Sequence, residues 1–90
     1  MNKARRKDIA SVIERMNAAL DPLNDCATDV ESIKDEEEEV YENMPEGLQG
    51  SEQGERIQEA VDALNEAHSA LETLMDSIEE IVGHLEAAAE

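Results

Sequence analysis

The chain has 90 residues and a formal net charge of −17, with 24 acidic and 7 basic residues, one Tyr, and neither Trp nor Phe. A chain of this length forms at most one domain with a modest core, here an aliphatic one. Its Ile and Val residues stand singly, which argues against strands, and its acidity argues against nucleic acid bound along the body, because phosphates require a basic face.

Cellular location follows from what the sequence lacks. The only cysteine, Cys26, has no partner for an internal disulfide, and the N-terminal stretch MNKARRKD lacks the apolar segment of a secretory signal. No apolar run approaches the roughly 20 residues that cross a bilayer. We therefore expect a cytoplasmic protein that makes no membrane contact.

A heptad seam predicts the first helix, over about residues 3–44. Its apolar residues recur at alternating steps of four and three: Ile9, Ile13, Met16, Leu20, Leu23, Ala27 and Val30. The seam resumes at Tyr41 and Met44 after the polar residues Lys34 and Glu37. Ile33 and Val40 offer an alternative seam, displaced by one position.

Pro22 admits two interpretations. Asp21-Pro22 could cap and begin a second helix, which would split the segment. Alternatively, proline inside a continuous helix bends it. We expect a helix kinked near Pro22, because the spacing of Leu20 and Leu23 stays in phase across the proline.

The stretch YENMPEGLQGSEQGE, residues 41–55, predicts a hairpin connector with its turn at residues 45–51. Gly47 and Gly50 are expected to supply the backbone freedom of the turn, and Leu48 to tuck under it.

A second helix is predicted over about residues 52–88, with Ser51 as its N-cap. Gly54 is unusual in a first turn, because glycine there costs up to about 1 kcal/mol relative to alanine. It predicts close approach by another backbone. The seam of this helix keeps the heptad rhythm through Ile57, Val61, Leu64, His68, Leu71, Met75, Ile78, Val82 and Leu85.

A flanking apolar column on the second helix predicts self-association. Its residues are spaced by seven: Ala60, Ala67, Leu74, Ile81 and Ala88. Together with the seam they make an apolar face wider than one partner helix can cover. The predicted fold is therefore all-α, with two long antiparallel helices that form one hairpin domain over residues 1–90. The hairpins are expected to assemble into an oligomeric helical bundle. The expected interface residues are Ala60, Ala67, Leu74 and Ile81. An antiparallel dimer forming a four-helix bundle is the simplest solution, while a larger ring or a heteromeric bundle also covers the column.

The acidic run Asp35–Glu39 is typical of a solvated helix face. It also suits a partner-binding surface, for which the candidate residues are Asp35, Glu36, Glu38 and Glu39. Glu37 lies on the seam and requires a counter-charge, and folding the hairpin about Leu48 places Arg56 within reach.

The basic residues gather at the N-terminal tip, in Lys3, Arg5, Arg6 and Lys7, whereas residues 8–90 carry 24 acids against 3 bases. In an antiparallel hairpin this tip faces the acidic end of the second helix, so we expect neutralisation by Glu79, Glu80, Glu86 and Glu90. Cations at a helix N-terminus oppose the helix dipole, however. A phosphate-bearing ligand or an acidic partner could offset that cost.

No catalytic or metal constellation is visible. His68 lies on the seam, near the level of Cys26, Ala27 and Thr28, and is expected to be a packed, hydrogen-bonded histidine, because two ligands are too few for a closed zinc site. There is no nucleophile–base set, phosphate-binding glycine loop, HExxH or CxxC. We expect no enzyme activity, metal or cofactor.

The segments NKARRKDI, KDEEEEVYENMPEGLQGSEQGE (34–55) and AVDALNEA resemble a family of small, uncharacterised, acidic helical proteins of bacteriophages and prophages. The family has no settled activity. The resemblance implies a non-catalytic phage accessory protein, in the cytoplasm of the bacterial host, that binds and blocks or sequesters a host factor, for example one of host defence. Two alternatives stay open: an oligomeric sponge for a nucleotide signal that uses the basic tip, and an acidic mimic of DNA.

Overall fold

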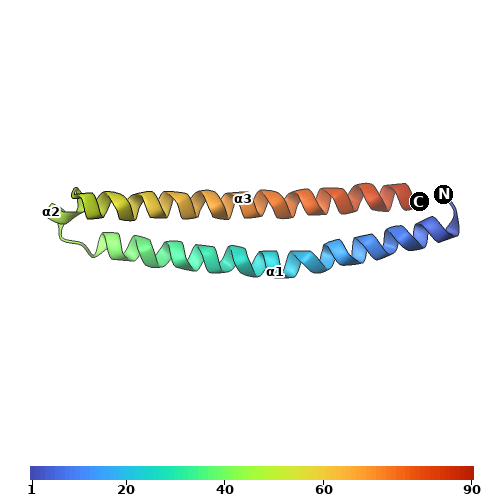
Figure 1. The fold of residues 1–90 in the computed structure, drawn as a ribbon, viewed down its shortest axis with the longest axis horizontal. Helices are drawn as coiled ribbons and strands as arrows, with labels where there is room; N and C mark the ends of the chain where they lie inside the picture. Colours follow the sequence, from blue (N-terminus) through green and yellow to red (C-terminus); the bar gives the residue numbers. More distant parts are fainter.

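The protein folds into a long helical hairpin. The computed structural model describes all 90 residues and contains α1 (Lys3–Glu42), the single-turn α2 (Glu46–Gln49) and α3 (Glu52–Ala89), without strands. α1 and α3 lie side by side and antiparallel, α2 joins them at one end, and both termini lie at the other (Figure 1). The predicted all-helical hairpin is thus confirmed, and each long helix ends within two residues of its expected boundary.

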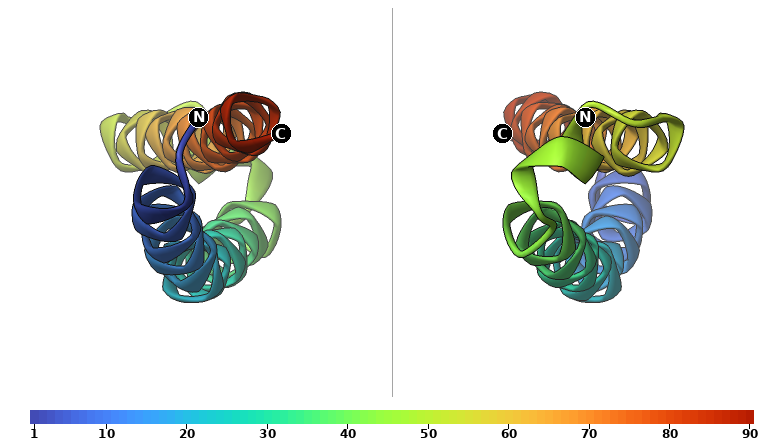
Figure 2. Two further views of the ribbon diagram at one scale, coloured as in Figure 1. Left: turned by 90° about the vertical axis from the view of Figure 1, so that its right-hand side faces the viewer. Right: turned by 90° about the vertical axis from the view of Figure 1, so that its left-hand side faces the viewer.

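The hairpin is a rod of 69 × 15 × 13 Å. Its radius of gyration is 20.2 Å, whereas a compact domain of this length has about 12 Å. End-on views show α1 on one side of α3 near the termini and on the other side near α2, so the two helices wind around each other (Figure 2). This winding follows from the seven-residue repeat, which an α-helix keeps in contact with a partner only by supercoiling.

The core is a single seam with little interior. Only four residues are buried: Ala27, Gly54, Val61 and Val82. The other seam residues are half-buried, and these include the polar Lys34 and Glu37, while Ile33 and Val40 each remain 49% exposed. The chain therefore uses the undisplaced seam. A switch to Ile33 and Val40 would rotate that part of α1 out of phase with the continuous seam of α3.

α1 is continuous through Pro22. The alternative of a separate helix starting at Asp21-Pro22 is therefore wrong. The single helix is capped at Asn2, whose Oδ1 accepts a hydrogen bond from the Arg5 N–H at 2.8 Å. Pro22 itself is exposed, while Leu20 and Leu23 are both half-buried toward α3, so packing continues past the proline. Figure 1 shows α1 bowed along its length.

The connector is built by the short helix α2 rather than by glycine freedom. No glycine has a positive φ, so the expected role of Gly47 and Gly50 is wrong. Leu48 is 49% exposed instead of tucked under the turn. One helical turn reverses the chain here because Pro45 has an extended ψ of 141° just before it.

Gln49 ties α2 to the end of α1. Its Nε2 donates to the carbonyl oxygens of Tyr41 at 3.1 Å and Met44 at 3.4 Å. The Tyr41 carbonyl also accepts the Met44 N–H at 3.1 Å, and Met44 lies just beyond the end of α1, so Gln49 adds a side-chain link between α2 and the segment that ends α1.

The start of α3 is held tightly against α2, as Gly54 predicts. Ser51 is the N-cap, and its Oγ accepts the Gly54 N–H at 3.4 Å and donates to the Leu48 carbonyl. A Cβ on Gly54 would lie 2.2 Å from the Gln49 carbonyl oxygen and 2.9 Å from that of Leu48. The predicted close approach of another backbone is confirmed.

Candidate functional site

The basic tip, defined as Lys3, Arg5, Arg6 and Lys7, forms the first turns of α1. All four side chains are exposed. The first turn holds no acidic residue, so nothing on α1 itself offsets the unfavourable placement of cations at the positive end of the helix dipole.

The expected neutralisation of the tip by α3 is wrong. No ion pair joins the tip to Glu79, Glu80, Glu86 or Glu90, although the two termini lie at the same end of the rod. The nearest interaction is a hydrogen bond of 3.5 Å from Arg6 Nη2 to the backbone carbonyl of Glu90. Long exposed side chains gain little from pairing in water.

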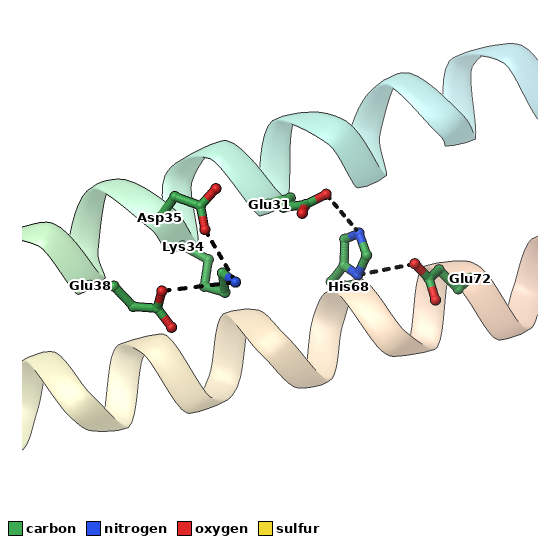
Figure 3. Close-up of polar contacts among 6 residues, drawn as sticks. All are labelled: Glu31, Lys34, Asp35, Glu38, His68 and Glu72. Carbon is green, nitrogen blue, oxygen red and sulfur yellow. Dashed lines mark ion pairs between the residues drawn. The ribbon is translucent and has the colours of Figure 1, made fainter.

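The acidic run surrounds one seam cation. Lys34 extends between α1 and α3, where its Nζ lies 3.2 Å from Asp35 and 4.0 Å from Glu38 (Figure 3). The hydrogen bond to Asp35 raises the pKa of Lys34 above its usual 10.5, and the charges of Glu38 and Glu31 add to this against a lowering by partial burial. Of the four predicted partner-binding acids, Asp35 and Glu38 are therefore engaged, while Glu36 and Glu39 are exposed and have no partner.

Arg56 does not neutralise Glu37. Arg56 pairs instead with Glu52, one turn earlier on α3. Glu37 is half-buried on the seam and has no ion-pair partner. The physical reason is the register: α2 adds a turn of helix to the connector, which shifts α3 along α1 relative to a fold about Leu48.

His68 shows the same shift. Its Nε2 lies 3.6 Å from Glu31 of α1 and its Nδ1 lies 3.4 Å from Glu72 of α3 (Figure 3). The histidine is therefore level with Glu31, one turn from the expected level at Cys26–Thr28. Both ring nitrogens face carboxylates, so the protonated imidazole would link the two helices. No group of three or more His, Cys, Asp or Glu is arranged to hold a metal ion.

A groove of about 420 Å³ lies between α1 and α3 near the connector, and no motif in the sequence predicted it. Three carboxylates, two amides, one phenol and one valine line it: Glu38, Glu42, Asp62, Gln58, Asn65, Tyr41 and Val61. These groups accept and donate hydrogen bonds, but they include no nucleophile with an adjacent base.

The predicted interface column is largely uncovered in the single chain. Leu74 is 46% and Ile81 44% exposed, Ala67 is exposed, and Ala60 is half-buried. α1 contributes Ile33 and Val40 as further exposed aliphatic residues. Exposed apolar side chains that recur along a rod mark an interaction surface.

Neither long helix contains a stretch apolar enough to pass through a membrane. Compared with models of known protein families, with curated proteins and with solved structures, the chain matches none of them.

Proposed function

We propose that the chain is a non-catalytic accessory protein that self-associates through its apolar surface and acts by binding another macromolecule stoichiometrically. The sequence resemblance to phage proteins suggests a host factor, one that the protein blocks or sequesters.

The observation that carries self-association is the small number of buried residues, four of 90. A compact monomer of 9.9 kDa exposes about 5,200 Å², whereas this chain exposes 6502 Å². A standard interface removes about 800 Å² from each partner. The surplus is therefore large enough for one such interface, and exposed aliphatic residues are available to fill it.

Size-exclusion chromatography with light scattering tests this step. At micromolar concentration we expect a dimer or a larger assembly, and Leu74→Glu should shift it toward monomer. Thr73→Glu is the matched control, because it adds the same charge at the adjacent exposed position outside the apolar column. A folded wild-type monomer at these concentrations would refute the proposal.

The proposed partner surface is the acidic run on α1, where Glu36 and Glu39 are exposed and unpaired. We expect Glu36→Gln combined with Glu39→Gln to reduce capture of the host partner, while Glu79→Gln with Glu86→Gln, on the polar side of α3, should not. DNA mimicry predicts in addition that the captured protein is basic and released by salt. Recovery of only neutral or acidic partners would remove mimicry.

A nucleotide-type ligand is the second candidate, because the basic tip has no carboxylate partner within the hairpin. Guanidinium groups bind phosphates through paired hydrogen bonds. Calorimetric titration with a panel of cyclic nucleotides should give heat that Arg5→Gln with Arg6→Gln abolishes. No heat from any of them would eliminate this candidate.

A further inference from the structure

The two sides of the hairpin differ sharply in polarity. With seam residues numbered as heptad positions a and d, position e follows each d and position g precedes each a. Glu38 of α1 and Gln58 and Asn65 of α3 are all e positions, and they line one groove. The e positions of both helices therefore share one side of the hairpin, and the g positions share the other.

Every g position between the tip and the connector is apolar. We call this set the apolar face: Val12, Ala19, Cys26, Ile33 and Val40 on α1, with Ala60, Ala67, Leu74, Ile81 and Ala88 on α3. It holds four of the six large hydrophobic residues that the chain exposes, and the other two, Met1 and Leu48, lie near the ends of the rod. Apart from Ala10, the e positions of the two helices are Asn, Gln and Glu. The hairpin thus has one apolar side, which a single flat partner can cover.

The register of the hairpin places large residues of this face beside small ones. The contact between Glu31 and His68 sets Cys26 level with Leu74, Ile33 level with Ala67, and Ala19 level with Ile81. The face is centred on Cys26 and Leu74. A second copy turned end for end would set Ile33 against Ala19 and Ile81 against Ala67, so that large side chains meet small ones across the interface.

Charge selects between the two ways of stacking two copies. The connector end, residues 35–59, carries ten acids and one base, whereas residues 1–7 carry four bases and no acid. A parallel pair would place both acidic ends together and each basic tip beside the C-terminal end of α3 of the other copy, where the only acids are Glu86 and Glu90. An antiparallel pair places each basic tip beside the acidic end of the other copy, which favours association through opposite charges.

We propose that two copies pack antiparallel through their apolar faces, forming a four-helix bundle with Cys26 and Leu74 at the two-fold axis. This inference rests on the self-association proposed above and specifies its face and direction. The two-fold axis crosses the rods, so α1 of one copy lies along α1 of the other. Val12 then meets Val40 of the second copy, and Arg5 and Arg6 lie beside Glu46 and its neighbours. The two basic tips lie at opposite ends, so they cannot jointly bind one nucleotide.

Disulfide trapping of the full-length chain tests the direction. Two variants in a Cys26→Ala background, Val12→Cys and Val40→Cys, are oxidised separately and as a mixture. A disulfide requires Cα atoms within about 7 Å, so we expect a covalent dimer only from the mixture. A mixture of Val12→Cys with Ala88→Cys serves as the comparison, because parallel packing sets those two positions together.

The outcomes separate this inference from the proposed function. A covalent dimer from Val12→Cys with Val40→Cys supports antiparallel packing. One from Val12→Cys with Ala88→Cys overturns it, while self-association stands. A dimer in light scattering that neither mixture traps shows that another surface or another order of assembly is used, which also overturns it. A folded monomer removes both proposals.

Charge reversal provides a second measurement. Arg5→Glu with Arg6→Glu should raise the dissociation constant of the dimer about tenfold, as the loss of several exposed ion pairs predicts. Adding Glu42→Arg and Glu46→Arg should restore it. An unchanged dissociation constant would contradict the placement of the tip beside the acidic end.

Discussion

Gly54 offers the most direct test of how the connector is held. A Cβ at this position would lie 2.2 Å from the carbonyl oxygen and 2.7 Å from the carbonyl carbon of Gln49, both of them backbone atoms of α2. A flexible side chain could move aside, but a backbone cannot move without displacing α2. Gly54→Ala should therefore break the contact between α2 and the start of α3.

The expected magnitude combines two opposing effects. Overpacking of this kind costs about 1–3 kcal/mol, while alanine in place of glycine inside a helix gains up to about 1 kcal/mol. We expect Gly54→Ala to lower the free energy of unfolding by about 1–2 kcal/mol, equivalent to roughly 5–15 °C in Tm for a chain of this size.

Gly83 provides the matched control. It lies inside α3, and a Cβ there would meet nothing within 4 Å. Gly83→Ala should therefore raise the free energy of unfolding by up to about 1 kcal/mol. Denaturant unfolding followed by circular dichroism measures both variants, at one protein concentration because assembly adds to stability. Equal stabilisation by the two substitutions would refute the close approach of α2 to Gly54.

Four further predictions concern the connector, the proline and the charges. Gln49→Glu removes the donor to the carbonyls of Tyr41 and Met44 and should cost about 1–3 kcal/mol in denaturant unfolding, whereas Gln53→Glu, exposed in the first turn of α3, should be neutral or stabilising. Pro22→Ala should raise the free energy of unfolding by up to about 3 kcal/mol, because Pro22 is exposed; a loss would mean that its bend is required. Folding raises the pKa of Lys34 above its usual 10.5. Its contribution to stability is therefore complete below pH 10.5 and is lost as the pH rises through the raised pKa of the folded state. The free energy of unfolding should fall more steeply with pH in this alkaline range for the wild type than for Lys34→Met. Because the net charge is −17, Tm should rise as ionic strength increases from about 20 to about 500 mM, and a fall would show that attractive ion pairs dominate.

The sequence predicted the helices well because their signals are local and repeated. The heptads specify two amphipathic rods, Ser51 has a side chain suited to capping, and a glycine in a first turn has few explanations other than close packing. Each of these features acts through neighbours within about one turn of helix, so its consequence is nearly independent of the rest of the fold.

The register between the helices could not be predicted in the same way. Residues 46–49 suit a loop or one turn of helix about equally, yet the helix moves the facing partner of His68 from Cys26–Thr28 to Glu31. The capping role of Gln49 depends on that same turn. The lack of ion pairs at the tip has a different cause, because exposed pairs gain too little to fix long side chains in one geometry.

The surfaces proposed for self-association and for partner binding differ, so one does not exclude the other. Glu39 lies at heptad position f, which faces away from both the seam and the apolar face, so it stays exposed when the apolar faces of two copies meet, whereas Glu36 lies at position c, at the edge of the apolar face. In the proposed antiparallel dimer these acidic surfaces lie toward opposite ends, so one dimer presents two of them. A partner that is itself dimeric or repeats along a polymer would then gain from simultaneous contacts, because the second contact is intramolecular. Assembly would thereby convert weak, salt-sensitive acidic contacts into stable sequestration.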